Sequence, residues 1–399
     1  MRLGLVVNPR AKGAGDPQLP ARLRALAERA GAVCEVAVTQ KPADLPQAAA
    51  ALAAFGMDVL AVCGGDGTLM TTLSAVTASE PATPVALPPL LLLPAGTMNT
   101  VAKNLGLPPQ PEALLQAALT AAAARGIAAV PYWPQDTLRV RTYGETPHDP
   151  ASLRSSRNEA RDRAADRAAP RQRIGDSATG EAAGAAGVAE RVLDESVISA
   201  LPQRERCGFL FSGAMGARFL SAYAAAPEPG LRWALILALR TIASCLYPGG
   251  GPLARWLFTP TPMRLVLDAA ARATNQPPGP AAPTAPVQIE GAFRLLIMST
   301  VADAGLGMRV PWRAGAVPGR FQLIASAIST LENALQLPRI LRAEPLRGAP
   351  HHDLLARAAQ LRFDIPQTLV LDGELFRAAA VDVALGPRLT VLRPTLLQP

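Results

Sequence analysis

The sequence contains few residues of the kinds that bind zinc or form disulfides. It has three histidines and four cysteines, and the cysteines lie far apart in apolar surroundings, at Cys34, Cys63, Cys207 and Cys245. No two of them form a CxxC pair. Isolated cysteines of this kind are typical of buried thiols in a reducing compartment. The sequence therefore predicts neither a zinc site nor a disulfide framework.

Long apolar runs are also missing. The longest candidate membrane segment, residues 231–247, is short for a span and is interrupted by Arg240. The N-terminal run at residues 3–7 is too short for the core of a signal peptide and ends at a turn, so it indicates a first strand. We therefore expect a cytoplasmic protein without a membrane-spanning helix.

Lysine is almost absent, although the chain is basic. It occurs only at Lys12, Lys41 and Lys103, so arginine carries nearly all of the formal net charge of +8. Such an arginine excess can simply follow from the base composition of a genome, but it also attracts nucleotides, anionic membranes and nucleic acids. Because no interleaving of aromatic and basic residues appears, we expect no nucleic-acid partner. The oligomeric state is left open.

The first third of the chain alternates short apolar strands with helices, which is typical of a doubly wound parallel sheet. The expected strands lie at residues 3–7, 32–39, 59–63 and 85–93, and the expected helices at 19–30, 46–55, 69–78, 97–105 and 111–125. Ligands of such sheets bind beyond the carboxyl ends of the strands. We therefore expect an α/β nucleotide-binding domain over residues 1–129.

Beyond residue 130 the pattern changes to short runs of alternating apolar and polar residues, which indicates a mainly β, sandwich-like second domain. Examples start at Thr137, Cys207, Met263, Phe293 and Phe321. We assign residues 130–399 to this domain and allow for a return of the extreme C-terminus to the first one. Residues 154–190 are rich in charged and small residues and predict a disordered insertion. Residues 273–286 predict a proline-rich loop.

Two glycine-rich loops follow the first and third strands. Residues 8–15 include Asn8, Pro9 and Gly13, and glycine permits the positive φ angles and close backbone approach of a phosphate cradle. Any turn between a strand and a helix can have this composition. The loop Gly64-Gly65-Asp66-Gly67-Thr68 is more specific, because it aims backbone N–H groups at an anion and holds an acid near magnesium or a proton. The alternative, a tight turn in which Asp66 only caps a helix, does not require three glycines.

A third glycine-rich loop and a distant acidic turn complete the set of motifs. The third loop, residues 94–100, offers Gly96, Thr97 and Asn99 at the start of a helix, where simple capping is the alternative. Three such loops at one edge of a sheet jointly predict a nucleotide phosphate site. The fourth motif, Asp372-Gly373-Glu374, lies between apolar strands and would be an ordinary hairpin turn in most proteins.

Together these motifs resemble the catalytic domain family of diacylglycerol kinases, which includes sphingosine and ceramide kinases. The resemblance covers nearly the whole chain apart from residues 154–190, and it rests on residues 6–9, 64–68, 96–99, 209–219, 305–311 and 372–374. It implies an ATP-dependent lipid kinase that phosphorylates a hydroxyl of a membrane lipid, such as diacylglycerol, ceramide or a sphingoid base.

The resemblance also implies roles for individual residues. ATP would lie across the Gly64–Thr68 loop, with its phosphates near Asn8 and Thr97, and Asn99 would contact the nucleotide. Asp66 or Asp372 would be the base that takes the proton from the lipid hydroxyl. Glu374 would help to position metal or nucleotide, and Mg²⁺ would bridge the phosphates. Positioning and charge neutralisation matter more than the base, because the transition state of phosphoryl transfer is loose.

The sequence departs from the family pattern at two places. Asn99 is followed by Thr100, where the family usually has aspartate. Pro318-Gly319 stands where the family usually has Asp-Gly, which removes an acid that some members use for a structural metal. No metal ligand is therefore assigned from the sequence.

Two other functions are open. NAD kinases and related soluble-substrate kinases also carry a Gly-Gly-Asp-Gly-Thr loop, but the loop around Thr97 and the acidic turn at Asp372 favour a lipid kinase. A catalytically silent lipid-binding module is the second alternative. The substitution at Pro318 favours it, whereas the retained acids Asp66, Asp372 and Glu374 argue against it.

Two segments predict helices that lie on a membrane. The first has apolar residues at helical spacing, with Trp233 and several arginines nearby: Leu231, Leu235, Leu239, Ile242 and Leu246, and Arg232, Arg240 and Arg255. The second candidate is residues 324–341. A helix buried against the β domain is the alternative for both. The hypothesis predicts peripheral membrane association that requires anionic lipid and weakens with salt.

Overall fold

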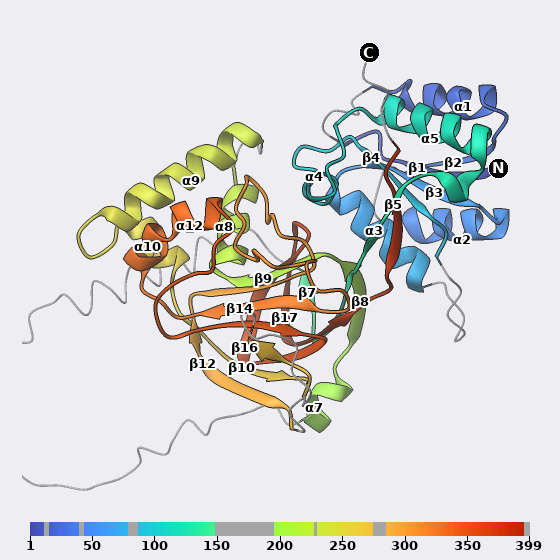
Figure 1. Cartoon of the computed structure of the whole chain (residues 1–399). Helices are drawn as coiled ribbons and strands as arrows, with labels where there is room; N and C mark the ends of the chain where they lie inside the picture. The colour runs from blue at the N-terminus through green and yellow to red at the C-terminus, as the bar shows by residue number, and fades with distance from the viewer. Residues whose placement is uncertain are drawn as a thin grey trace, which may run out of the picture.

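The computed structural model describes residues 1–11, 16–39, 44–78, 87–147, 195–226, 230–273 and 285–394. The predicted insertion at 154–190, the site candidate Gly13 and residues 274–284 of the proline-rich loop lie outside the described residues. Figure 1 shows two lobes, an α/β lobe built mainly from the N-terminal third and a larger β-rich lobe.

The first lobe contains a six-stranded sheet with the order β2-β1-β3-β4-β18-β5. Its first four strands in the chain pair in parallel: β1 (Arg2–Val7), β2 (Val33–Val38), β3 (Val59–Gly64) and β4 (Leu90–Pro94). Every residue of β3 and β4 is buried, because helices cover both faces of the sheet. The predicted doubly wound α/β domain is confirmed.

The covering helices are those that the sequence predicts, with shifted starts. They are α1 (Leu19–Arg29), α2 (Leu45–Phe55), α3 (Asp66–Ala78), α4 (Thr100–Asn104) and α5 (Pro111–Arg125), followed by the short 3₁₀ helix η2 (Ile127–Ala129). α1 packs beside α5, and α2 packs beside α3 (Figure 1). The predictions that α3 begins at Leu69 and α4 at Thr97 are wrong, so Asp66 lies in the first turn of α3.

Two strands from beyond residue 129 complete this sheet. β18 (Leu389–Leu392) lies parallel to β4, and β5 (Tyr132–Gln135) pairs with β18 in the antiparallel sense. The last described strand thus returns to the first lobe after the chain has built the second (Figure 1). We assign β5 and β18 to the first domain.

The second lobe is a twelve-stranded antiparallel sheet, as predicted for the β domain. Its main path runs β11-β15-β14-β13-β9-β16-β17-β6-β8, and β10, β12 and β7 pair onto it. The strands are β6 (Leu138–Tyr143), β7 (Thr146–Pro147), β8 (Gln203–Gly208), β9 (Leu210–Ala214), β10 (Thr261–Leu267), β11 (Arg272–Ala273), β12 (Val287–Phe293), β13 (Leu295–Ser299), β14 (Phe321–Ser326), β15 (His351–Ala356), β16 (Ala358–Leu371) and β17 (Glu374–Leu385). Alternate residues of these strands form a core that includes Phe211, Phe321, Leu361 and Phe376.

Helices gather at one end of the second lobe (Figure 1). They are α8 (Met215–Ala224), α9 (Leu231–Leu246), α10 (Pro252–Leu257), α11 (Thr330–Leu335) and α12 (Leu337–Leu341), and α7 (Glu195–Ala200) lies apart from them. The expectation of one helix over residues 324–341 is wrong, because residues 324–326 belong to β14 and the rest is divided between α11 and α12. No helix within the described ranges is both long and apolar enough to cross a membrane.

Candidate functional site

The carboxyl ends of β1, β3 and β4 bring the glycine-rich loops to one edge of the first sheet. Asn8 follows β1, and its Nδ2 donates a hydrogen bond of 2.9 Å to Oγ1 of Thr68. The backbone N–H of Asn8 donates to the carbonyl of Cys63 at 3.0 Å. The half-buried Pro9 comes next in the chain. The structure therefore brings the described part of the first loop against the second.

Three of the glycines are required by close approach. A Cβ on Gly96 would lie 2.4 Å from the Cα of Gly65, so the two loop backbones touch. A Cβ on Gly64 would lie 2.6 Å from the side chain of Thr68. None of these three glycines has a positive φ. Close packing therefore explains why glycine stands there, against the other loop's backbone at Gly65 and Gly96 and against the Thr68 side chain at Gly64, and no unusual backbone conformation is involved.

Gly67 differs from the other three. It lies in the first turn of α3, its φ is not positive, and nothing lies within 4 Å of the position that a Cβ would occupy. The protein itself therefore does not require glycine at this position. The missing side chain leaves open space above the N-terminus of α3, where backbone N–H groups favour an anion.

Asp66 ties the second loop to the third. Its Oδ2 accepts a hydrogen bond from the N–H of Thr100 at 2.8 Å, and its Oδ1 accepts one from the N–H of Val101 at 3.0 Å. Asp66 therefore caps α4, the helix that follows the third loop, although it belongs to α3. Each carboxylate oxygen keeps a second lone pair for another partner.

Asn99 shapes the third loop. Its φ of 48° is left-handed, and its side chain closes on the backbone of Gly96. Oδ1 accepts from the Gly96 N–H and Nδ2 donates to the Gly96 carbonyl, both at 2.8 Å. Asn99 is buried, whereas Thr97 is exposed at the tip of the loop. The loop thus presents Thr97 outward and uses the polar atoms of Asn99 internally.

Asp372 and Gly373 form the two-residue turn between β16 and β17. Leu371 and Glu374 are the last paired residues, and the turn has φ angles of 45° at Asp372 and 93° at Gly373. Positive φ at both positions is typical of a type I′ hairpin turn, for which Asp-Gly is a preferred sequence. The hairpin interpretation of this motif is therefore correct, and it does not account for where the Asp372 carboxyl group points.

The Asp372 carboxyl group points inward, to the break between β8 and β9. It accepts hydrogen bonds from the backbone N–H groups of Phe209, at 2.9 Å, and Leu210, at 2.8 Å. A Cβ on Gly208 would lie 2.6 Å from Oδ2. Part of the Asp372 residue remains at the surface, but its carboxyl group is enclosed by these neighbours.

The enclosure changes the acidity of Asp372. Burial raises its pKa from an ordinary aspartate value to about 8, and the two amide hydrogen bonds only partly offset that increase. The negative charge of Asp66 raises the same pKa further. The two candidate bases, which are far apart in the sequence, are therefore close enough to interact electrostatically. An acid with such a pKa can hold or release a proton near neutral pH.

Glu374 is held by a buried arginine that the sequence did not reveal. Nη2 of Arg206 lies 3.8 Å from Oε1 of Glu374, whose side chain is 40% exposed. The same guanidinium donates to Glu145 at 2.5 and 2.6 Å and is only 4% exposed. β8 contains a second arginine, the exposed Arg204, so nothing in the sequence marked Arg206 as the buried one. Burying its charge requires acidic partners.

The two lobes are joined by polar contacts that the sequence also did not reveal. Nδ2 of Asn104 donates to the carbonyl of Asp303 at 3.0 Å, and Oδ1 of Asn104 accepts from the Asp303 N–H at 2.8 Å. On the other side, the N–H of Cys207 donates to Oγ of Ser74 in α3 at 2.9 Å. These contacts place the loop at residues 305–311 beside the third glycine-rich loop, where Gly305 faces Met98.

Pro318-Gly319, which departs from the family pattern, lies beside Asp136. The N–H of Gly319 donates to Oδ2 of Asp136 at 2.7 Å, and Nε of Arg388 lies 3.5 Å from Oδ1 of Asp136. Within the described part of the chain, no three His, Cys, Asp or Glu side chains come together as a possible metal site.

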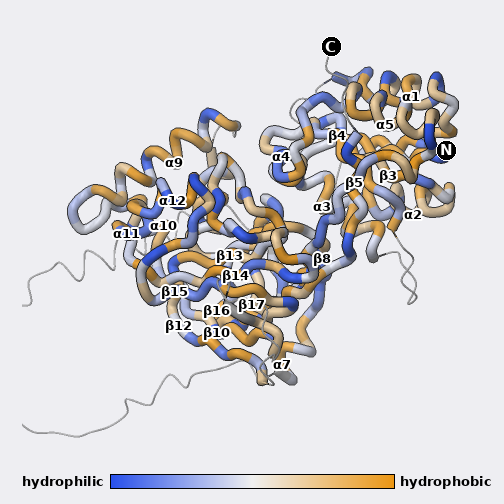
Figure 2. Tube along the Cα trace, in the orientation of Figure 1, coloured by the Kyte–Doolittle hydropathy of each residue, from blue (hydrophilic) through white to orange (hydrophobic). Residues whose placement is uncertain are grey.

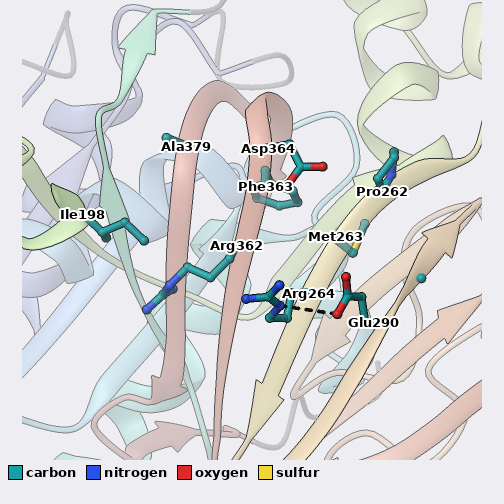
Figure 3. A pocket seen from close by; sticks show the side chains of 10 residues that line it. Ile198, Pro262, Met263, Arg264, Glu290, Arg362, Phe363, Asp364 and Ala379 are labelled. Carbon is teal, nitrogen blue, oxygen red and sulfur yellow. Dashed lines mark ion pairs between the residues drawn. The ribbon is translucent and has the colours of Figure 1, made fainter. Parts of the chain in front are cut away.

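A cavity of about 150 Å³ lies elsewhere, on the outer face of β10, β12 and β16 (Figure 3). Arg264 and Arg362 are direct cross-strand neighbours there. Each has an acidic partner, Glu290 at 3.6 Å from Arg264 and Asp382 at 2.8 Å from Arg362. Because its arginines are paired and it contains none of the glycine-rich loops, this cavity is not the candidate phosphate site. Near the loops there is a cavity of only about 20 Å³, which Gly64, Asp66 and Asn99 help to line.

Replacing Asp66 with alanine is expected to lower the free energy of unfolding by about 1–3 kcal/mol, because the N–H groups of Thr100 and Val101 lose their acceptor. Urea denaturation measures this change. Asp58→Ala is the matched control, since Asp58 also accepts a backbone N–H, that of Arg2 at 2.7 Å, but at an exposed position where water can replace it. Equal losses in the two variants would contradict a structural role for Asp66 in joining the loops.

Comparison with known proteins identifies a family match and a shared fold. Residues 2–129 match the family model of the diacylglycerol kinase catalytic domain, so the expected resemblance is confirmed over that part of the chain. No curated protein sequence matches the chain. The family match supports a kinase of the lipid kinase family.

Three solved structures from Bacillus anthracis str. Sterne share the fold. One is a diacylglycerol kinase with a TM-score of 0.52 and 11% identity, covering 99% of this chain and 98% of that chain. The two others carry the same family name, have TM-scores of 0.55 and 0.53 and are each 12% identical. They cover 99% of this chain and 97% and 98% of their own. At this identity the likeness establishes the two-domain fold.

Proposed function

We propose that this chain is an ATP-dependent lipid kinase that transfers the γ-phosphate to a hydroxyl of a membrane lipid such as diacylglycerol, ceramide or a sphingoid base. One observation carries the proposal. The Asp372 carboxyl group of the second lobe is held by the amides of Phe209 and Leu210, and its pKa is raised mainly by burial and further by the charge of Asp66, which lies in the Gly64–Thr68 loop of the first lobe. An acid of intermediate pKa beside a glycine-rich helix N-terminus suits transfer of a phosphoryl group to an alcohol.

The phosphates of ATP would lie over Gly67, at the N-terminus of α3. The open space above that residue and the free first-turn N–H groups provide a cradle without side-chain obstruction. Thr97, exposed at the tip of the third loop, would contact the same phosphates. Asn8 and Asn99 would act mainly by fixing the loops, since their side chains are bonded to Thr68 and to Gly96.

Mg²⁺ fits this site as a companion of the phosphates. In proteins Mg²⁺ usually keeps several water ligands and is bound by phosphate oxygens of the nucleotide together with one or two carboxylates. A cluster of three or more protein ligands is therefore not required. Asp66 has lone pairs left, and the Glu374 carboxylate is partly exposed, so these two residues would hold the ion. When bound, the ion neutralises charge on the transferred phosphoryl group.

Asp372 would take the proton from the lipid hydroxyl. Its pKa of about 8 is close to the pH of the cell, where a general base both accepts protons readily and is ionised for part of the time. The amides of Phe209 and Leu210 would hold the carboxyl group in place. Because such a substrate carries its hydroxyl on an apolar tail, the enzyme would act as a peripheral protein at a membrane surface, which we expect to be the cytoplasmic one.

The proposal is tested by incubating the purified full chain with labelled ATP, Mg²⁺ and a panel of lipids in mixed micelles. NAD is included as a soluble acceptor. Labelled phospholipid that depends on ATP supports the proposal and identifies the lipid. Labelled NADP in the absence of lipid would instead show a soluble-substrate kinase. Absence of ATP binding, measured by calorimetry, would reject both.

Replacing Gly67 with alanine is expected to raise the KM for ATP about tenfold while the midpoint of thermal unfolding stays the same or rises slightly, because alanine is more favourable than glycine in a helix. The added methyl group enters space that the protein leaves open, so only a bound phosphate meets it. Steady-state kinetics over a range of ATP concentrations measures the change. An unchanged KM in a folded variant would place the phosphates elsewhere.

A further inference from the structure

The outward face of α9 is apolar. Its exposed side chains include Leu231 at 49%, Leu235 at 48%, Leu239 at 66% and Leu246 at 57% exposure, followed by Tyr247 at 68%. Figure 2 shows hydrophobic colours over most of this helix. A surface helix normally turns polar residues outward, but α9 is apolar on both its buried and its exposed face.

Neighbouring helices extend the apolar character. α11 packs beside α9 and exposes Leu331 and Leu335, and α12 follows with the exposed Leu341. Of the fifteen exposed large hydrophobic side chains in the described ranges, seven lie in these three helices, and Tyr247 directly follows α9. Such a concentration on one surface marks a binding site for another apolar surface.

The charges on α9 and on the segment that follows it have a single sign, although the adjacent α11 contributes one exposed acid, Glu332. Residues 230–267 contain Arg232, Arg240, Arg255 and Arg264 and no aspartate or glutamate. Arg232 and Arg240 lie on α9 itself and are exposed beside the leucines. Arginines near an apolar face attract an anionic lipid surface and let the face enter the interface. A second copy of the same face would instead bring arginines together without acidic partners on α9.

We propose that this α9 face, formed by Leu231, Leu235, Leu239, Leu246 and Tyr247 with Arg232 and Arg240, docks on an anionic lipid bilayer. The helix would lie in the plane of the interface with its leucines among the acyl chains. This proposal rests on the proposed lipid kinase function and adds a membrane partner to it. Docking would bring the candidate site to its lipid substrate.

The structure connects the docking face to the site. β9 begins at Leu210, whose N–H binds Asp372, and leads directly into α8, which packs against α9 and α10. Arg218 of α8 is pinned by hydrogen bonds to the Thr259 carbonyl at 2.6 Å and to Oγ1 of Thr261 at 2.8 Å. A membrane-bound α9 would therefore hold Asp372 in a defined position relative to the lipid.

The test compares binding of the full chain to phosphatidylcholine vesicles and to vesicles that also contain phosphatidylglycerol, by co-sedimentation. The double variant Leu235→Gln/Leu239→Gln is expected to lose at least about tenfold in partitioning, because two exposed leucines no longer enter the interface. Ile365→Gln is the matched control, since Ile365 is 66% exposed on the second lobe but lies outside these helices. It is expected to bind like the wild type.

Charge is tested separately with Arg232→Gln/Arg240→Gln. This variant is expected to lose about fivefold in affinity for each arginine, only on anionic vesicles, and to show weaker salt dependence. Equal binding of the wild type to neutral and anionic vesicles, or undiminished binding of the leucine variant, would overturn the proposal. Wild-type protein that self-associates and binds no vesicle would assign the face to a second copy.

The docking proposal and the kinase proposal fail in different ways. Transfer of phosphate to a short-chain lipid dispersed as monomers needs no docking, so the leucine variant is expected to keep that activity. A wild-type protein that binds anionic vesicles but phosphorylates no lipid would reject only the kinase function. A wild-type protein that phosphorylates monomeric lipid but binds no vesicle would reject only the docking surface.

Discussion

Replacing Asp372 with asparagine is expected to lower the rate of phosphate transfer to lipid by about 10²–10⁴-fold, the range that a general base contributes. Asparagine is close in size to aspartate but cannot accept the proton of the lipid hydroxyl. Binding of ATP should change little, because the glycine-rich loops belong to the first sheet. Initial rates at saturating ATP and lipid measure the effect.

The pH profile separates the chemical role of Asp372 from its structural role. The pKa of Asp372 in the folded protein is about 8, above its value in the unfolded chain. Transfer should therefore rise with pH as this group ionises, and Asp372→Asn should lose that rise. Because the folded pKa is the higher one, the contribution of Asp372 to stability is complete below the unfolded pKa and is lost as pH rises through about 8.

Stability provides the control for this variant. An asparagine oxygen can replace only part of the carboxylate, so one of the amides of Phe209 and Leu210 loses an acceptor, at a cost of about 1–3 kcal/mol. Denaturation at neutral pH shows whether Asp372→Asn is still folded under assay conditions. A folded variant with nearly wild-type transfer would exclude Asp372 as the base and leave Asp66.

Replacing Gly96 with alanine is expected to weaken ATP binding by at least about tenfold and to lower the free energy of unfolding by about 1–3 kcal/mol. The new Cβ would lie 2.4 Å from the Cα of Gly65 and 2.8 Å from Oδ1 of Asn99, so the second and third loops must move apart. Both loops belong to the proposed phosphate site. Calorimetric titration with ATP and urea denaturation measure the two losses.

Gly67→Ala is the matched variant for Gly96→Ala. It adds the same methyl group to a neighbouring glycine of the site, but where the protein leaves space. We expect loss of stability only at Gly96 and loss of ATP binding at both positions. Wild-type stability of Gly96→Ala would contradict the close packing of the two loops.

The first lobe was predictable because its signals are local. Runs of buried apolar residues mark β1, β3 and β4, and proline in the first turn marks α1, α2 and α5. Composition also identified the glycines of the second and third loops. The reason why glycine is needed there could not be read from the sequence, because Gly65 and Gly96 must both lack a side chain for the two loops to touch.

The hydrogen-bond partners of Asp66 and Asp372 could not be predicted, because they belong to segments far away in the sequence. Asp66 lies in the first turn of α3 and caps α4, and nothing near Asp66 in the sequence indicates that partner. The Asp372 turn is recognisable from Asp-Gly, but the amides that hold its carboxyl group belong to Phe209 and Leu210.

In the second lobe, too, the sequence pattern did not reveal which strands pair. The apolar runs that start at Cys207 and at Phe293 were each expected to be one strand, but each is shared between two strands, which are divided at Phe209 and at Arg294. Alternation of apolar and polar residues predicts a strand but does not show where the chain leaves one neighbour for another. Arg206, between Glu145 and Glu374, likewise becomes a site candidate only once three strands lie side by side.

The most direct test of the central claim is transfer of labelled phosphate from ATP to lipid by the wild type and Asp372→Asn, side by side in anionic mixed micelles. We predict labelled phospholipid from the wild type and a loss of about 10²–10⁴-fold in the variant, with ATP binding retained by both. Absence of labelled lipid from a wild-type protein that binds ATP, over the whole lipid panel, would contradict the assignment as a lipid kinase.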